Sequence, residues 1–192
     1  MAAELERDPF RYHHWQLPDE TEGYKNHTGD QRRIGTVVVT ASRVPRRLGI
    51  DYAVHVKRGE KLGLTLARLP MRDFDPADQR LRLPDAVRTL HELLCDGHRV
   101  YVHCTAGINR SSLVVLAYFI FVESQSEDIA MATIQLRRPE AAPYWDALHA
   151  CHQDLLEQHQ DALRERAEDL SRQSLYPDAH SVRLQAERAI IR

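Results

Sequence analysis

Cysteine occurs only three times in this chain of 192 residues. Such an odd and sparse set cannot build a disulfide framework, so we expect the chain to work in a reducing compartment. Long apolar runs are missing from the sequence as well: the longest, residues 113–122, is roughly half of what a membrane-spanning helix needs. The first residues, MAAELERDPF, include acids and no apolar stretch, which disfavours a secretory or transit peptide. We therefore expect a cytoplasmic protein that does not bind membranes.

The chain also has no excess of charge of one sign. Its formal net charge is -2, which disfavours binding to bare nucleic acid or anionic lipid. Hydrophobic residues make up 43% and charged residues 28%, which is typical of a soluble globular domain. The neighbouring His13 and His14 have no cysteine or acid at ligand spacing. We therefore expect no metal and no other cofactor.

Strands and helices alternate in the pattern of the sequence. Short β-branched or alternating segments at residues 36–40, 64–71 and 99–103 predict strands. Helical periodicity and capping residues predict helices from Pro84 to about Asp96, over residues 113–123 with Ser111 and Ser112 as N-caps, over residues 126–138, and from about Tyr144 onward. This order favours an α/β sheet covered by helices.

The most informative segment is VYVHCTAGINRSS, residues 100–112. It predicts a buried strand that leads to Cys104, a tight loop that contains Gly107, and a helix that begins just after Arg110. Successive backbone N–H groups in such a loop, together with the positive end of the helix, form a cradle for a phosphate dianion. We assign phosphate binding to Thr105, Ala106, Gly107, Ile108, Asn109 and Arg110.

The same electrostatic field favours the thiolate form of Cys104, and the thiolate is the nucleophile. We expect Cys104 to attack phosphorus and form a phosphocysteine, while the planar fork of Arg110 holds two phosphoryl oxygens. Ser111 can donate a hydrogen bond to the sulfur, which would help the thiolate to leave when water hydrolyses the intermediate. His103 is expected to orient the loop rather than to act as a base.

The leaving alkoxide needs a proton from a carboxylic acid on another segment. Asp73, Asp75 and Asp78 lie after one predicted strand and before the helix that leads back to the Cys104 strand. Any one of them could instead cap that helix, and this pattern does not choose among the three.

The octapeptide Cys104-Thr-Ala-Gly-Ile-Asn-Arg-Ser111 resembles the signature loop of the cysteine-based dual-specificity protein phosphatases. The resemblance runs from about Leu64 to Leu156. It implies a protein-tyrosine-phosphatase-like α/β fold, with a central mixed sheet flanked by helices. The general acid of that family lies about thirty residues before the cysteine, and the matching position here is Asp73.

A narrower resemblance, carried by Cys-Thr-Ala-Gly in the loop, Arg72-Asp-Phe-Asp75 and Arg82-Leu-Pro84, is to the glucan phosphatases of plants (the starch-excess type) and animals. It implies a phosphorylated glucan as substrate. Aromatic side chains, which suit the apolar C–H faces of sugars, would line the site. The matching aromatics are Phe74, Tyr144 and Trp145, although Tyr144 and Trp145 could equally pack in the core. The segment Pro9–His14 resembles the start of the N-terminal recognition segment of these enzymes.

One position and one longer segment depart from the glucan-phosphatase pattern. Asn109 stands where those enzymes usually carry glycine. An asparagine at this position is similar to the one in the loop of RNA 5′-triphosphatases. Those enzymes, however, usually have histidine at the position of Ala106. Between Tyr24 and Gly63 the sequence is also shorter than the family pattern. The alternatives to a glucan phosphatase are therefore a protein dual-specificity phosphatase and, less favoured, an RNA 5′-triphosphatase or an inactive module that binds phosphorylated ligands.

The sequence predicts three regions: an N-terminal recognition region that is abbreviated (residues 1–63), a dual-specificity phosphatase core (residues 64–160) and a charged helical extension (residues 161–192).

Overall fold

The computed structural model of the chain describes residues 34–38, 52–61, 63–173 and 176–191. Its strands are β1 (Ile34–Val38), β2 (Thr65–Arg68) and β3 (Arg99–His103). They form a parallel sheet in the order β2-β1-β3, in which Thr36 lies opposite Leu66 on one side and Tyr101 on the other. The sequence predicted all three strands, although β1 begins earlier than predicted. An antiparallel strand, which a mixed sheet requires, is not among these residues, and the predicted recognition segment at Pro9–His14 lies outside them.

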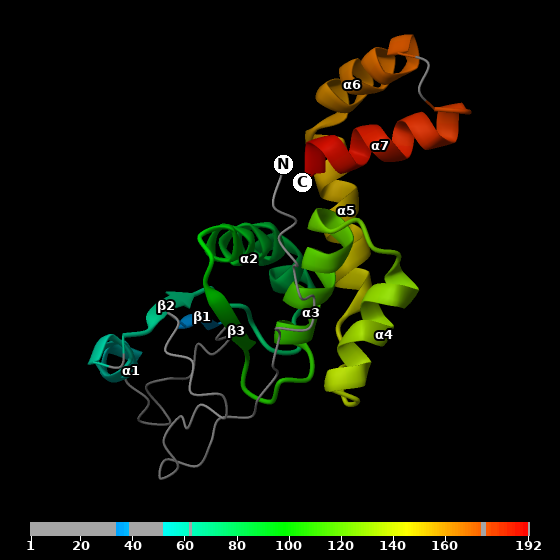
Figure 1. Cartoon of the computed structure of the whole chain (residues 1–192). Coiled ribbons are helices and arrows are strands. Elements are labelled where there is room, and N and C mark those ends of the chain that lie inside the picture. The colour runs from blue at the N-terminus through cyan, green and yellow to red at the C-terminus, as the bar shows by residue number, and fades with distance from the viewer. Residues whose placement is uncertain (1–33, 39–51, 62, 174–175, 192) are drawn as a thin grey trace.

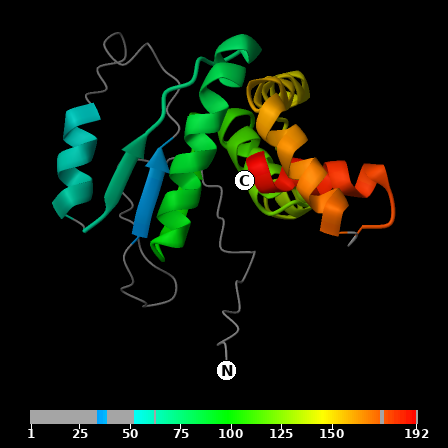
Figure 2. The same ribbon diagram turned by 90° about the horizontal axis from the view of Figure 1, so that it is seen from above.

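Helices cover the sheet and extend beyond it (Figure 1). In chain order they are α1 (Tyr52–Lys61), α2 (Pro76–Cys95), α3 (Arg110–Ala117), the π-helical segment η1 (Tyr118–Val122), α4 (Glu127–Arg137), α5 (Trp145–Gln158), α6 (Gln160–Gln173) and α7 (Ala179–Ile191). Helices α1 and α2 lie on opposite sides of strands β2 and β1 (Figure 2). Because β2 and β3 are parallel, α2 serves as the crossover connection between them.

Helix α2 begins earlier than the sequence predicted. We expected it to start at Pro84, but it starts at Pro76, and Pro84 lies inside it. Asp75 is the N-cap and accepts a hydrogen bond from the backbone N–H of Asp78, while Pro76 occupies the first turn, where a missing N–H does no harm. The buried face of α2, which includes Leu83 and Leu90, holds the helix on the core despite the internal proline.

Helix α3 also starts earlier than predicted. Its N-cap is Asn109 and its first residue is Arg110, whereas we expected Ser111 and Ser112 to cap it. The Ser112 hydroxyl instead donates to the carbonyls of Ile108 and Asn109. All eight residues of α3 are buried, so the helix runs through the main hydrophobic core together with η1.

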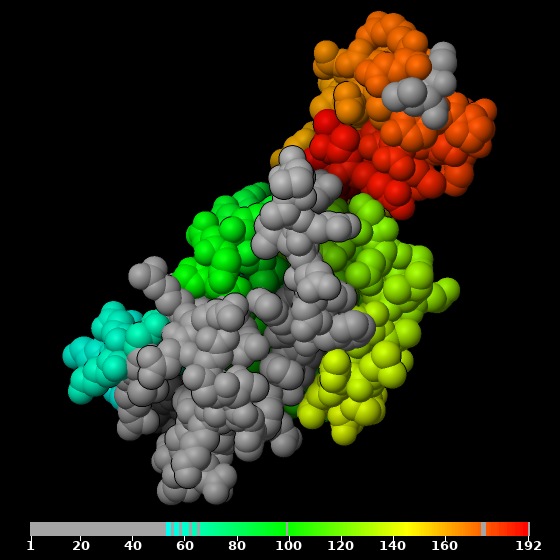
Figure 3. All heavy atoms as spheres, in the orientation of Figure 1, coloured from blue at the N-terminus to red at the C-terminus, as the bar shows by residue number. Residues whose placement is uncertain are grey.

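The last two helices form a lobe at one end of the molecule (Figure 3). Helices α6 and α7 enclose a small core of their own, made by Leu170, Val182 and Ala186. Ile191, at the end of α7, packs back against the main core. No helix within the described residues has the length and hydropathy needed to cross a membrane.

Candidate active site

Two loops meet at the carboxyl edge of the sheet. The segment from Met71 to Asp75 follows β2, and the loop from Cys104 to Asn109 follows β3. Because β2 and β3 are parallel and flank β1, both loops leave the sheet at the same edge, where ligands bind in many parallel α/β sheets. The topology therefore brings together residues that are far apart in the sequence.

Cys104 lies at the floor of the β3–α3 loop, with only 3% of its surface exposed. Its sulfur is 3.4 Å from the Ser111 hydroxyl. Burial by itself would raise the pKa of Cys104, but hydrogen bonds from the Ser111 hydroxyl and backbone N–H, the charge of Arg110, and the backbone N–H of Gly107 outweigh it. The net result is a thiol pKa below its ordinary value of 9.0.

Arg110 begins α3 and is 1% exposed, yet its guanidinium reaches both loops. Its Nη2 donates to Thr105 Oγ1 at 3.0 Å and to Asp73 Oδ2 at 2.8 Å, and its Nη1 lies 3.5 Å from the Met71 carbonyl oxygen. A buried arginine held in this way keeps its planar fork in a fixed place.

The three candidate acids have different surroundings. Asp75 caps α2, and Asp78 accepts a hydrogen bond from the backbone N–H of Arg72 at 2.8 Å. Asp73 has no such role at the helix start, and its carboxylate faces Arg110 with 40% of the side chain exposed. The geometry therefore places Asp73 beside the Cys104 loop and uses the other two acids at the start of α2.

The segment between α4 and α5 supports the outer side of the Cys104 loop. Arg138 donates from Nη2 to the Ala106 carbonyl at 3.0 Å. The backbone N–H of Ala142 donates to the Ile108 carbonyl at 2.9 Å, and the Asn109 side-chain amide donates to the Ala142 carbonyl at 3.0 Å. Nothing in the sequence indicated that Arg138 and Ala142 support the loop. Any residue that lies close enough can donate a hydrogen bond to an outward-facing carbonyl, so such donors form no recognisable sequence pattern.

The three predicted aromatic residues do not share one exposed surface. Phe74, beside Asp73, is 82% exposed and has a φ of 54°, in the left-handed region that bulky residues rarely adopt. Tyr144 and Trp145, at the start of α5, are half-buried and pack against the main core. Phe74 is thus available to a ligand, whereas Tyr144 and Trp145 are available only in part.

Residues 35–153 match the family model of the dual specificity phosphatase, catalytic domain. This match covers more than half of the chain. The chain belongs to this family. The loop from Cys104 to Ser111, which resembles the signature loop of this family, lies within the matched residues.

Relatives in this family include both glucan and protein phosphatases by name. Laforin of Mus musculus is 33% identical over 113 residues, which are 59% of this chain and 34% of laforin. Phosphoglucan phosphatase DSP4, amyloplastic, of Castanea sativa is 38% identical over 90 residues (46% of this chain, 24% of that protein). Dual specificity protein phosphatase Mpk3 of Drosophila melanogaster is 29% identical over 108 residues (53% and 26%). The chain thus spans about a third or less of the length of these relatives.

Solved structures show the same fold. The crystal structure of PTPMT1 superposes with a TM-score of 0.52 at 23% identity and covers 67% of this chain and 82% of that one. Tk-PTP in the active form superposes with a TM-score of 0.50 at 23% identity (67% and 81%). The predicted protein-tyrosine-phosphatase-like fold is therefore confirmed.

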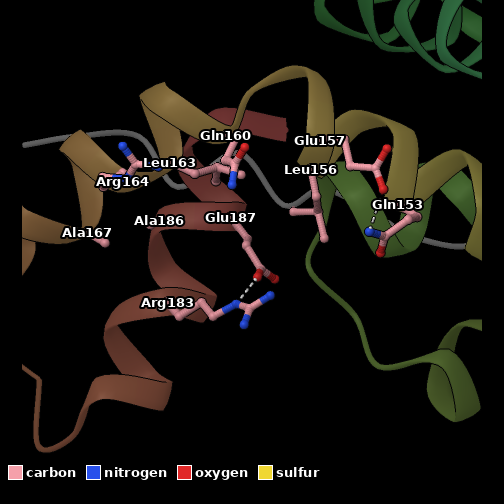
Figure 4. Close-up of a pocket in the computed structure, with 10 residues that line it drawn as sticks. All are labelled: Gln153, Leu156, Glu157, Gln160, Leu163, Arg164, Ala167, Arg183, Ala186 and Glu187. Carbon is pink, nitrogen blue, oxygen red and sulfur yellow. Dashed lines mark hydrogen bonds and ion pairs between the residues drawn. The ribbon is translucent and has the colours of Figure 1, made fainter.

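A groove away from the Cys104 loop is lined almost entirely by residues that follow the matched domain. It lies between α5, α6 and α7 and has a volume of about 480 Å³ (Figure 4). Leu156, Leu163 and Ala186 contribute its apolar part, and an ion pair between Arg183 and Glu187 lies at its edge. Among the described residues, no group of three or more histidine, cysteine or acidic side chains is placed to hold a metal ion.

Proposed function

We propose that this chain is a cysteine-dependent phosphatase that hydrolyses phosphomonoesters through a phosphocysteine intermediate. The observation that carries the proposal is the surroundings of Cys104. Backbone N–H groups, a hydroxyl and a buried arginine all favour negative charge at one sulfur. These are the groups that would also stabilise the oxygens of a phosphoryl group above it.

The reaction takes two steps. The Cys104 thiolate attacks phosphorus, the bond to the substrate oxygen breaks, and a protonated Asp73 gives its proton to the leaving alkoxide. Water then attacks the phosphocysteine and loses its proton to the Asp73 carboxylate. The S–P bond breaks, inorganic phosphate leaves, and the Ser111 hydroxyl stabilises the departing thiolate. Arg110 and the N–H groups of residues 105–110 hold the phosphoryl oxygens in both steps.

Asp73 must leave Arg110 before it acts. A phosphoryl dianion offers Arg110 two oxygens in the fork geometry, against the single contact of 2.8 Å with Asp73. Substrate binding would therefore release the Asp73 carboxyl from Arg110, and its position on the neighbouring loop allows it to face the leaving oxygen.

The substrate that we propose is a phosphorylated glucan. Phe74 supports this choice, because it presents an exposed aromatic face directly beside Asp73. The similarity to DSP4, which is named a phosphoglucan phosphatase, favours the same substrate.

A phosphorylated protein is the second candidate substrate. Tyr144 and Trp145 are partly buried in the core, so a continuous aromatic platform for a sugar chain is not formed by these three residues alone. The similarity to Mpk3, which is named a dual specificity protein phosphatase, favours the same candidate.

A generic aryl phosphate tests the catalytic proposal. Cys104→Ser should lower phosphate release by at least about a thousandfold, because a hydroxyl is a far weaker nucleophile than a thiolate. Cys95→Ser is the matched control, since Cys95 is exposed at the end of α2. Equal rates of phosphate release by the wild type and Cys104→Ser would refute the proposal that Cys104 is the nucleophile of a phosphatase.

Phosphorylated amylopectin and a phosphopeptide panel, compared at equal phosphate concentration, separate the two substrates. For a glucan phosphatase, Phe74→Ala should lower kcat/KM on amylopectin about tenfold and leave the rate on aryl phosphate nearly unchanged. Ile129→Ala, which removes another exposed apolar side chain on α4, is the control. Faster release from phosphopeptides than from amylopectin would assign the chain to protein substrates.

A further inference from the structure

Building on the proposed phosphatase activity, we infer that the side chain of Asn109 is a positioning residue. It ties the Cys104 loop to the segment that leads into α5, and it thereby keeps the N–H groups of the loop directed at the Cys104 sulfur. This role of the Asn109 side chain is separate from phosphate binding, which we assigned to the backbone N–H of the same residue. The side-chain amide donates to the Ala142 carbonyl, on the segment that leads into α5.

The Cys104 loop needs partners on its outer side. When its N–H groups turn inward to an anion, the carbonyl groups between them turn outward and have to be satisfied elsewhere. The Ala106 carbonyl is satisfied by Arg138, and the Ile108 carbonyl by the backbone N–H of Ala142 and the hydroxyl of Ser112. The outer side of the loop is thus held by residues 138–142.

Asn109 closes this connection in the opposite direction. The Ala142 N–H donates to Ile108 at 2.9 Å, and the Asn109 amide donates back to the Ala142 carbonyl at 3.0 Å. The two hydrogen bonds join adjacent loop residues to both polar groups of one residue on the neighbouring segment. Such a pair fixes the separation and the orientation of the two segments, which one hydrogen bond would not do.

The position of Asn109 makes this choice of partner informative. Asn109 is the N-cap of α3, where an asparagine side chain ordinarily accepts a hydrogen bond from the backbone of the first helical turn. Here its side chain makes no capping hydrogen bond. Its Oδ1 is buried and has no hydrogen-bond partner among the described residues. The side chain therefore gives up the usual stabilisation of the helix start and binds Ala142 instead.

The connection acts on the nucleophile through the residues on both sides of Asn109. Gly107 and Ser111, whose backbone N–H groups lower the pKa of Cys104, lie two residues before and two residues after it. If the loop separates from the 138–142 segment, these N–H groups lose their fixed direction and the thiolate loses part of its stabilisation. Ala142 also directly precedes Pro143 and Tyr144, so the same connection sets where α5 begins relative to the phosphate site.

Asn109→Ser is the test variant, because serine is as good an N-cap as asparagine but is too short to reach the Ala142 carbonyl. Asn109→Ala, whose side chain can neither cap α3 nor reach the Ala142 carbonyl, provides a second variant. Gln153→Ala is the matched control, since it removes an amide that donates to Glu157 on the exposed face of α5. The readout is the rate at which iodoacetamide alkylates Cys104 across a pH series, followed on the peptide that contains it, together with the Kd for orthovanadate.

We expect Asn109→Ser to keep the wild-type unfolding temperature, to shift the alkylation profile of Cys104 to higher pH, and to bind orthovanadate about two- to tenfold more weakly. Gln153→Ala should match the wild type in all three. The inference would be overturned if both Asn109 variants showed the same alkylation profile and the same orthovanadate affinity as the wild type. Alkylation and orthovanadate binding do not require turnover. An inactive wild type would thus refute the proposed function and leave this test intact.

Discussion

Two buried cysteines of this chain have opposite electrostatic surroundings. Cys104 meets a hydroxyl, two backbone N–H groups and the charge of Arg110, and its pKa lies below the ordinary value. At Cys151, on α5, burial and, to a smaller extent, the nearby Asp154 carboxylate raise the pKa to about 12, and the charge of Arg80 opposes them only in part. The two thiols therefore differ in reactivity although both are buried.

We predict that iodoacetamide modifies Cys104 well before Cys151 at neutral pH. The rate for Cys104 should rise as pH increases through its lowered pKa and level off at a lower pH than the rate for an ordinary thiol, because its reactive thiolate forms at lower pH. Cys151 should stay unmodified over this range. Peptide mass spectrometry of a pH series measures both residues in one sample, and equal rates would contradict the lowered pKa of Cys104.

The contact of Asp73 with Arg110 gives a second prediction for a single residue. Asp73→Asn removes a carboxylate that competes with a phosphate for Arg110, so orthovanadate should bind roughly two- to fivefold more tightly. The same variant should lower kcat about a hundredfold for an alkyl or sugar phosphate and much less for an aryl phosphate with a good leaving group. Asp75→Asn, at the helix cap, is the control for the kinetic effect. If that control shows the larger loss, Asp75 is the acid.

The β3–α3 loop depends on one backbone conformation. Gly107 has a φ of 68°, and a Cβ added there would find its nearest neighbour, Arg138 Nε, at 3.8 Å, which is ordinary contact. A side chain would therefore fit, and the penalty at this position comes from the backbone. Gly97, before β3, has a φ of 78° and open space around it.

Gly107→Ala and Gly97→Ala form a matched pair for this loop. Each should destabilise the fold by about 1 kcal/mol, because an L-residue disfavours the left-handed region. Only Gly107→Ala should also weaken orthovanadate binding, since relief of the strain turns its N–H away from the sulfur. Thermal unfolding and an orthovanadate titration of both variants check this, and intact binding by Gly107→Ala would show that the loop tolerates another conformation.

The lobe of α6 and α7 is joined to the rest of the molecule at both of its ends. Helix α6 follows α5 directly, and Ile191 at the end of α7 packs against the main core. The guanidinium of Arg188 lies 3.5 Å from the carbonyl of Ser124, just after η1. The extension therefore contributes apolar contacts to the body of the domain in addition to its own small core.

Ile191→Ala should lower the free energy of unfolding by about 1 to 2 kcal/mol, because a half-buried isoleucine loses part of its contacts with the core. Leu184→Ala, on the same helix but 40% exposed, should change it by no more than about 0.5 kcal/mol. Urea denaturation of the two variants measures the difference. Equal stabilities would mean that the end of α7 does not hold the lobe on the core.

The position of the Cys104 loop was predictable because it depends on residues that are close together in the sequence. Cysteine, glycine and arginine within one short segment after a strand specify an anion-binding loop by local backbone geometry, and that loop lies where it was expected. The helix starts were harder to predict. Pro84 is a strong local signal, but packing of Leu83 and Leu90 carries α2 through it, and Asp75-Pro76 marks the true start.

The sequence alone therefore settled the fold class and the segment around Cys104, since hydrophobic pattern and short-range geometry are written in consecutive residues. The residue pattern by itself left three acids open, and the family resemblance pointed to Asp73. In the structure, the parallel pairing of β2 and β3 beside β1 places Asp73 next to Arg110, while Asp75 and Asp78 serve the start of α2. The sequence contained no sign of the support from Arg138 and Ala142, because hydrogen bonds to outward carbonyls depend on which segments pack together in space.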